Sequence, residues 1–314
     1  MKPKIIAIVG PTASGKSSTA IHLAQRLNGE IVSMDSMQVY RRMDIGTAKP
    51  TQAQLQAAVH HLIDVAAPSE LFTVSDYRRL AYSAIDDILA RGKLPILVGG
   101  TGLYLNAISY EMNLGTNGAD SSIRAELNQI AEQKDGAHQL HLRLHEVDPV
   151  SAQKLHENDV RRVIRALEVF YTTGIPISER GDETKEEGPY HVLVYGLSLP
   201  REQMYARIDA RVDDMIDSGL IDEVQCLLDS GIEPRKEGGA MQAIGYKEIV
   251  SALRSEISME RAIYLIKQGS RRYAKRQWTW FRHDERTQWF DWTDYPGEES
   301  LLSALLSKIE SDLR

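Results

Sequence analysis

The stretch IIAIVGPTASGKS at residues 5–17 decides the fold of this chain. Its first five residues form a short apolar run that stops at Gly10-Pro11, which predicts a buried strand. The residues after the turn predict a helix, because apolar side chains recur there at helical spacing (Ala20, Leu23, Ala24 and Leu27). A glycine-rich turn between a strand and a helix is the context that a phosphate-binding loop requires.

The turn also has the chemistry of a phosphate site. Its glycines let backbone N–H groups wrap an anion, and the start of the following helix adds the positive end of its dipole. Lys16 supplies a mobile positive charge, and the hydroxyl of Ser17 is a candidate ligand for Mg²⁺. The residues of this predicted phosphate-binding loop are Gly10, Pro11, Thr12, Ala13, Ser14, Gly15, Lys16 and Ser17, and the loop alone does not say which phosphate compound it binds.

Further apolar runs predict strands at residues 30–34, 94–98 and 191–197, and helical periodicity predicts a helix over residues 77–91. Strands that alternate with helices predict a parallel sheet with helices on both faces. The fold class is therefore α/β, a P-loop NTPase-like parallel sheet flanked by helices, with a mostly helical insertion domain.

The insertion is predicted where strand-like runs disappear. Between residues 114 and 190 helical segments dominate, for instance 122–133 and 160–171. We therefore expect an α/β core domain made of residues 1–113 and 191–314, and a helical domain of residues 114–190.

Composition limits the class of protein. The formal net charge is −7, and hydrophobic residues make up 42% of the chain. No stretch approaches the ~18 consecutive apolar residues of a transmembrane helix, and the first residues do not read as a secretory signal, so we expect a cytoplasmic protein. The single cysteine, Cys226, excludes an intramolecular disulfide and a cysteine-based zinc site, and its helical context predicts a buried side chain.

One segment of this acidic chain is strongly basic. Residues 261–283 contain no Asp or Glu and seven cations, namely Arg261, Lys267, Arg271, Arg272, Lys275, Arg276 and Arg282. Such a concentration of positive charge points to a polyanionic partner. We expect Trp278 and Trp280, which lie among these cations, to pack in the core.

Two further strand ends carry polar side chains toward the same edge of the sheet. Asp35 follows the strand at 30–34, so it is a candidate general base, with a turn or cap role as an equal alternative. Thr101 follows the strand at 94–98 and Gly99-Gly100. Gln38 could pair with the edge of a base. An acid that would hold Mg²⁺ for ATP turnover is expected at such a strand end, and the strand LPILV ends in glycines instead.

The motifs together resemble the tRNA dimethylallyltransferase (tRNA isopentenyltransferase) family. They run in family order across nearly the whole chain: GPTASGKS at 10–17, DSMQVYRRMDIGTAKP at 35–50, HHLIDV at 60–65, GGTGLYL at 99–105, DVRRVIRALEV at 159–169, AMQAIGYKEI at 240–249 and AKRQWTWFRH at 274–283.

The resemblance implies that N6 of the adenosine 3′-adjacent to the anticodon attacks dimethylallyl diphosphate and releases pyrophosphate with the help of Mg²⁺. It assigns catalytic roles to Asp35 and Thr101, and it places Arg207 and Arg211 near the diphosphate. It also implies a monomer that contacts the anticodon stem-loop of tRNA. The tRNA-contacting positions carried over are Asp35, Ser36, Met37, Gln38, Thr101, Arg124, Asp159, Val160, Arg161, Arg162, Val163 and Gln242.

Three other functions share some of these features. A small-molecule kinase or NTPase has the phosphate loop but predicts a magnesium-binding acid at a strand end. A transferase that prenylates free adenine nucleotides needs no helical insertion. An RNA-binding module without activity would leave the phosphate loop and Asp35 without a role.

Overall fold

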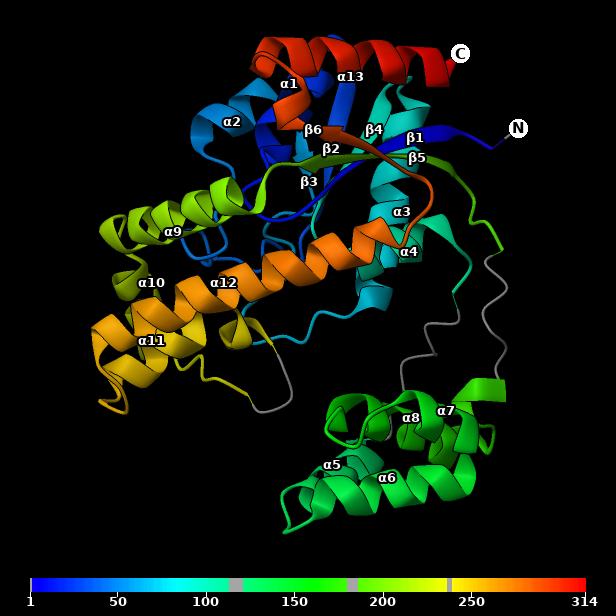
Figure 1. Ribbon diagram of the computed structural model, residues 1–314, viewed down its shortest axis with the longest axis vertical. Coiled ribbons are helices and arrows are strands. Elements are labelled where there is room, and N and C mark those ends of the chain that lie inside the picture. Colours follow the sequence, from blue (N-terminus) through cyan, green and yellow to red (C-terminus); the bar gives the residue numbers. More distant parts are fainter. Residues whose placement is uncertain (1, 113–120, 180–185, 236–238) are drawn as a thin grey trace. The chain divides into compact units, whose positions relative to one another are not determined.

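The structure is a computed structural model that describes residues 2–112, 121–179, 186–235 and 239–314 (Figure 1). The chain divides into two compact units, one of Met1–Tyr110 with Glu187–Arg314 and the other of Glu111–Glu186. The division after Glu186 falls four residues before the predicted return at 190, because Gly188 already bonds to the α/β unit through its N–H and the carbonyl of Ser109 (2.8 Å).

The first unit is built on a six-stranded sheet in the order β3-β2-β4-β1-β5-β6, and every neighbouring pair is parallel. The predicted α/β class is therefore confirmed. The strands are β1 (Lys4–Val9), β2 (Gly29–Met34), β3 (His60–His61), β4 (Leu94–Gly99), β5 (His191–Ser198) and β6 (Thr287–Asp291). The two edge strands were not predicted from the sequence, because β3 has only two residues and the side chains of β6 are all partly exposed.

Alternate residues of β1 pack into two different layers, as the period of a strand requires. Ile5, Ala7 and Val9 join the core under α3 and α4, whereas Ile6 and Ile8 join the core under α1 and α13. Helices therefore cover both faces of the sheet (Figure 1). The helices involved are α1 (Lys16–Arg26), α3 (Val74–Ala90), α4 (Gly102–Ser109) and α13 (Glu298–Leu313).

A second helical group follows β5 in the same unit. Its core joins α10–α12 to Val39, Tyr40 and Met43, which come from the segment after β2. The 24-residue helix α12 begins at Ser258, whose side chain accepts the N–H of Arg261, and it is the longest helix described. The remaining helices of the unit are α2 (Gln52–Ala57), α9 (Arg201–Asp217), α10 (Leu220–Asp229), η2 (Ala240–Gln242), α11 (Tyr246–Leu253), α12 (Met259–Arg282) and η3 (Trp292–Asp294).

The second unit is helical and has a core of its own. Leu127, Leu140, Leu144 and Leu167 are among the buried residues that its helices share. The elements of this unit are α5 (Ser121–Ala131), α6 (Gly136–Val147), α7 (Pro149–Lys154), α8 (Val160–Thr173) and η1 (Ile177–Glu179).

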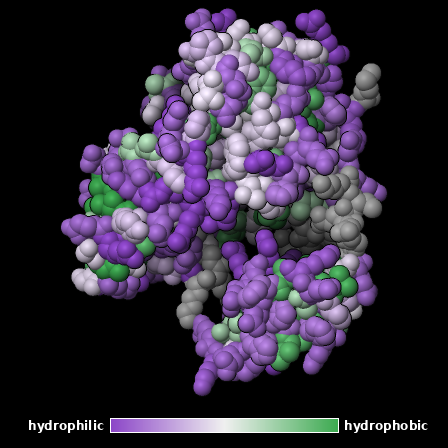
Figure 2. Space-filling view, viewed as in Figure 1, coloured by the Kyte–Doolittle hydropathy of each residue, from purple (hydrophilic) through white to green (hydrophobic). Residues whose placement is uncertain are grey.

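Polar side chains cover most of the surface seen in Figure 2, and the exposed apolar residues form small separate patches. No described helix is long and apolar enough to cross a membrane. The prediction that Cys226 is buried is wrong, because the side chain is exposed. Helix α10 buries Leu220, Val224 and Leu227, and this spacing turns Cys226 toward solvent.

Candidate active site

The carboxyl ends of three neighbouring strands bring the predicted reactive residues together. Gly99 at the end of β4 pairs with Val9 of β1 and with Met34 of β2. The chain continues from these positions into the phosphate loop, Asp35 and Thr101, and the N–H of Thr101 donates to the carbonyl of Met34 at 3.2 Å. Ligands of open α/β sheets bind at this edge.

The phosphate loop has the conformation that its glycines predict. Gly10 and Gly15 have φ angles of +141° and +89°, and a Cβ on Gly10 would lie 2.4 Å from the carbonyl oxygen of Leu197. Gly15 precedes α1 without any side-chain cap, so the first N–H groups of the helix stay free for an anion. The buried hydroxyl of Ser14 has no partner among the described residues. The loop is therefore shaped to receive a phosphate group.

Charge is concentrated beside the loop. Lys16 donates its Nζ to the carbonyl of Pro11 at 2.6 Å. Burial and, to a smaller extent, nearby Arg211 lower the pKa of Lys16 to about 7, although Asp35 opposes both effects. Burial also lowers the pKa of Arg211, and Asp35 again opposes the shift. Without an anion, two cations therefore share one carboxylate, and a bound diphosphate would relieve their repulsion.

Two cavities meet at this cluster. The smaller, of about 100 Å³, is lined by Lys16 and Ser17, and the larger, of about 330 Å³, extends between α9, η2 and α12. Four residues line both cavities: Thr12, Asp35, Arg211 and Tyr273. The arrangement offers one chamber at the phosphate loop and a second chamber for another reactant, with Asp35 where they meet.

Asp35 has the turn-capping role that the sequence offered as an alternative, and one of its oxygens is left for another partner. Its Oδ1 accepts the backbone N–H groups of Met37 at 2.8 Å and Gln38 at 3.2 Å, so it caps the turn after β2. Its Oδ2 has no hydrogen bond within the described residues and remains available as a proton acceptor. Gln38 lines the smaller cavity, but its Nε2 already donates to the carbonyls of Thr47 and Ala48, both at 3.2 Å.

The structure distinguishes the two predicted arginines. Arg211 lines both cavities beside Lys16 and Asp35. Arg207 is exposed one turn earlier on α9, with its Cζ 5.9 Å from the centre of the Trp292 ring. Of the two, Arg211 is the one that lines the cavity at the phosphate loop.

Three residues of the site were not predicted. Tyr273 lines both cavities, and burial together with Asp35 raises its pKa to about 12, so the phenol stays neutral. Gln277 accepts the N–H of Thr12 at 2.8 Å and donates to the carbonyl of Gly100 at 3.1 Å. The indole N–H of Trp292 donates to the carbonyl of Ser14 at 2.8 Å. The only signal in the sequence was the motif AKRQWTWFRH, which contains Tyr273's neighbours and Gln277.

Thr101 lies at the edge of this set. It lines neither cavity, but its buried hydroxyl lies beside the phenol of Tyr273 and opposes the rise in the pKa of that phenol. Of the other predicted tRNA contacts in this unit, Ser36, Met37 and Gln242 line the larger cavity. The side chain of Gln242 is also anchored, since its Nε2 donates to the carbonyl of Arg235 at 2.7 Å.

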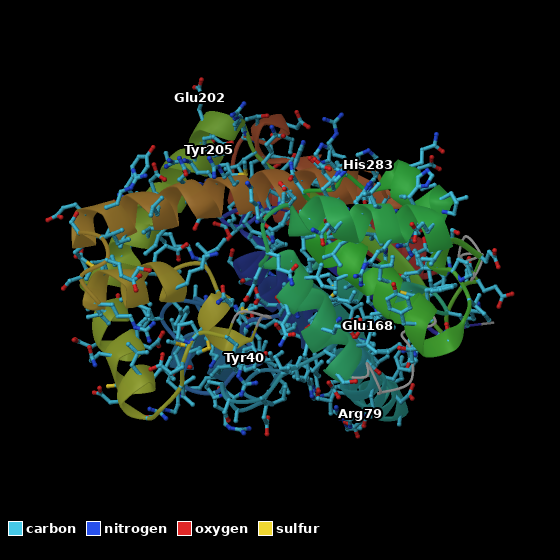
Figure 3. All side chains as sticks on the ribbon, turned by 90° about the horizontal axis from the view of Figure 1, so that it is seen from below. Tyr40, Arg79, Glu168, Glu202, Tyr205 and His283 are labelled. Carbon is cyan, nitrogen blue, oxygen red and sulfur yellow. The ribbon has the colours of Figure 1, made fainter. Side chains whose placement is uncertain are left out.

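The remaining predicted tRNA contacts lie in the helical unit. Asp159 precedes α8 and forms an ion pair with Arg162 at 3.3 Å, and Arg161 is exposed. Val160 is half-buried, and Val163 is fully buried in the core of the unit, so Val163 has no side-chain surface to offer to RNA. Arg124 donates to the buried carboxylate of Glu168, which Figure 3 labels, at 2.8 Å.

The basic segment forms α12, and its cations are not equivalent. Lys267 and Arg271 pair with Asp213 and Asp209 of α9, whereas Arg272 and Lys275 are exposed and have no ion-pair partner among the described residues. The helix ends before His283, which is labelled in Figure 3.

The expectation that both tryptophans of α12 pack in the core is wrong for Trp280, and Trp278 is only half-buried. Trp278 packs on Trp289, with ring centres 4.7 Å apart. Trp280 is 43% exposed, and its ring lies over Gly102, where a Cβ would come within 2.1 Å of it.

A parallel sheet whose first strand enters a phosphate loop, with a second cavity beside the loop, defines a phosphate-loop α/β protein with room for a second ligand. The IPP transferase family profile matches residues 38–284 of the chain. The chain belongs to the IPP transferase family, and the predicted tRNA dimethylallyltransferase identity is thereby confirmed.

Similar proteins support this assignment over the full length. A tRNA dimethylallyltransferase of Oceanobacillus iheyensis is 48% identical over 313 residues, which cover 100% of this chain and 97% of the relative. One of Carboxydothermus hydrogenoformans is 50% identical over 304 residues, which cover 96% and 94%.

Two solved structures of similar proteins support the same family assignment. A tRNA isopentenylpyrophosphate transferase of Bacillus halodurans superposes with a TM-score of 0.74 at 46% identity and covers 99% of this chain and 97% of its own. A eukaryotic dimethylallyltransferase acting on tRNA superposes with a TM-score of 0.79 at 33% identity and covers 92% and 74%.

Proposed function

We propose that this chain transfers the dimethylallyl group of dimethylallyl diphosphate to N6 of the adenosine 3′-adjacent to the anticodon of tRNA, and that the two cavities hold the two reactants. The observation that carries the proposal is the meeting of both cavities at Asp35 and Arg211. The diphosphate belongs in the smaller cavity, which contains Lys16 and Ser17, and the adenine belongs in the larger one.

In this proposal the residues of the site have separate roles in a single displacement reaction. The N6 electron pair forms a bond to C1 of the allylic group, the C1–O bond breaks, and its electron pair leaves with pyrophosphate. The free amides of the phosphate loop, Lys16 and Arg211 stabilise the negative charge that grows on the leaving group. Asp35 accepts the proton of N6 through its free Oδ2, because an aromatic amine is a weak nucleophile until it loses that proton.

Mg²⁺ is the proposed cofactor, and the residues present suit it. The smaller cavity is lined by the hydroxyl of Ser17 and the carboxylate of Asp35. Mg²⁺ prefers oxygen ligands and usually combines one or two protein groups with substrate phosphates and water. Ser17 would hold the ion against the diphosphate, and the ion would then neutralise part of the charge of the leaving group.

The acceptor is proposed to be the anticodon stem-loop. Its adenosine must be unstacked to enter a chamber, as enzymes that modify bases require. The exposed Arg272 and Lys275 of α12 carry charges that suit the phosphate backbone, as do Arg161 and Arg162 of the helical unit. We propose that the protein acts as a monomer in the cytoplasm, where its tRNA acceptor is found.

The test is transfer of label from radioactive dimethylallyl diphosphate. Unmodified tRNA and AMP are offered as acceptors, each with and without ATP. We expect label in tRNA, with a rate that does not require ATP. Label in AMP alone would assign the protein to the transferases of free nucleotides, and ATP hydrolysis without any transfer would assign the loop to a kinase or NTPase.

A further inference from the structure

One carboxylate outside both cavities holds the loop that lines them. Glu223 of α10 accepts the backbone N–H groups of three consecutive residues, at 2.7 Å from Asp44, 2.8 Å from Ile45 and 3.1 Å from Gly46. It also accepts the hydroxyl of Tyr246 at 2.5 Å. A carboxylate has acceptor sites for about four donors, so these four bonds satisfy Glu223 completely.

The segment that Glu223 holds forms part of the wall of the site. Gly46 and Thr47 line the larger cavity, and Ala48 lines the smaller one. The segment lies tightly against α11, because a Cβ on Gly46 would come within 2.5 Å of the Tyr246 ring. Since Glu223 lines neither cavity, it has no direct access to a bound reactant.

The same segment continues to Asp35 through hydrogen bonds. The carbonyls of Thr47 and Ala48 accept the Nε2 of Gln38, and the N–H of Gln38 donates to Oδ1 of Asp35 at 3.2 Å. The turn that orients the Asp35 carboxylate is therefore anchored, through the side chain of Gln38, to Thr47 and Ala48. These two residues directly follow the three that Glu223 binds.

We infer that Glu223 is a positioning residue, which holds residues 44–48 and through Gln38 sets the geometry of Asp35 toward the acceptor. The inference rests on the proposed transfer to tRNA. It predicts a specific sensitivity, because glutamine has the same shape as glutamate but only one accepting oxygen. In Glu223→Gln the side-chain NH₂ would face backbone N–H donors, and the segment would lose its anchor.

The experiment compares Glu223→Gln with Asp222→Asn, a matched control that removes an exposed charge from the same turn of α10. Rates are normalised to the number of pyrophosphate-binding sites, so that loss of folded protein is not counted as loss of activity. We expect Glu223→Gln to lower kcat for tRNA by about tenfold to a hundredfold, the scale of a misplacement near 1 Å. The affinity for pyrophosphate should stay within about twofold, as should all parameters of Asp222→Asn.

Hydrogen exchange supplies a local readout that general destabilisation would not reproduce. In Glu223→Gln the amides of Asp44, Ile45 and Gly46 should lose protection, while those of β1 should keep it. Glu223→Asp keeps the charge but retracts the oxygens by one methylene, so it should show a smaller loss of both kcat and protection. This second variant decides the question if Glu223→Gln does not fold.

The outcomes separate this inference from the proposed function. If the wild type transfers to tRNA and the folded Glu223 variant transfers equally fast per site, only the inference fails. Unchanged exchange at Asp44–Gly46 would overturn it as well. If the wild type transfers no prenyl group to tRNA, the proposed function fails, and the role of Glu223 fails with it.

Discussion

The side-chain amide of Gln277 joins the phosphate loop to the end of a neighbouring strand: its Oε1 accepts the N–H of Thr12 at 2.8 Å, and its Nε2 donates to the carbonyl of Gly100 at 3.1 Å. The side chain is buried, and a Cβ on Gly100 would lie 1.8 Å from its Nε2. This close approach explains why a glycine follows β4. Gln277 of α12 thereby sets the spacing between the phosphate loop and the segment that leads from Gly100 to Thr101.

Replacing Gln277 by leucine should therefore weaken donor binding. The change leaves the part-buried N–H of Thr12 and the buried carbonyl of Gly100 unpaired, and an unpaired buried group costs about 1–3 kcal/mol. We expect a lower melting temperature and at least about tenfold weaker binding of pyrophosphate by calorimetry. Gln268→Leu, a glutamine on the same helix that lines neither cavity, is the control. Wild-type pyrophosphate affinity in Gln277→Leu would contradict the bracing role.

Asp35 can be tested by a change that keeps the turn. Asn retains an oxygen that can accept the N–H groups of Met37 and Gln38, but it cannot take a proton from N6. We expect Asp35→Asn to bind tRNA normally and to transfer the prenyl group about 100-fold more slowly or worse, the scale of a lost general base. Single-turnover transfer and filter binding measure the two quantities. A rate near that of the wild type would show that Asp35 only caps the turn.

The lowered pKa of Lys16 predicts how donor capture depends on pH. With a pKa of about 7 in the free protein, Lys16 is charged below that pH and becomes neutral above it. Because the charged form binds the diphosphate, kcat/KM for the donor should fall as pH rises through about 7. In Lys16→Arg the guanidinium stays charged, so this decline should disappear.

The comparison is made as pH profiles of kcat/KM, since these report groups of the free enzyme. At saturating donor the bound diphosphate raises the pKa of Lys16, so kcat should not decline over the same range. An identical decline in wild type and Lys16→Arg would assign it to another group.

The cations of α12 offer a matched test of RNA binding. Arg272 is exposed and has no ion-pair partner among the residues that the structure covers, whereas Lys267 is paired with Asp213. Arg272→Ala should weaken tRNA binding and reduce the slope of log K against log salt by about one, as expected for one lost phosphate contact. Lys267→Ala should leave the slope nearly unchanged. Equal slopes for both variants and the wild type would mean that this face of α12 does not meet RNA.

The local parts of the site were predictable because short segments specify them. The loop at 10–17 has its strand before it and its helix after it, and strand ends at Met34 and Gly99 place Asp35 and Thr101 on one edge. Hydrophobic periodicity predicted these elements, because one buried face per element is enough to set the period. Edge strand β6 was not predicted, because its residues are all partly exposed and its hydrophobic pattern is weak.

The long-range parts were not predictable, because no local pattern says which distant side chain meets which loop. Gln277 bonds to a residue 265 positions away, and Trp292 bonds to one 278 positions away. For the same reason the sequence could not choose between Arg207 and Arg211, which are four residues apart on one helix and differ only in the direction each faces.

The sequence by itself determined the phosphate loop, the parallel sheet, the family and the identity of the carboxylate at the strand end, since each follows from residue types at short spacing. Only the tertiary structure decided that the two cavities meet at Asp35, that Arg211 rather than Arg207 lines them, and that Gln277 and Glu223 bond to segments of their walls. The physical reason is that these contacts form when α9, α10 and α12 pack against the segments that follow the strands, and packing of distant helices joins residues whose separation along the chain carries no signal.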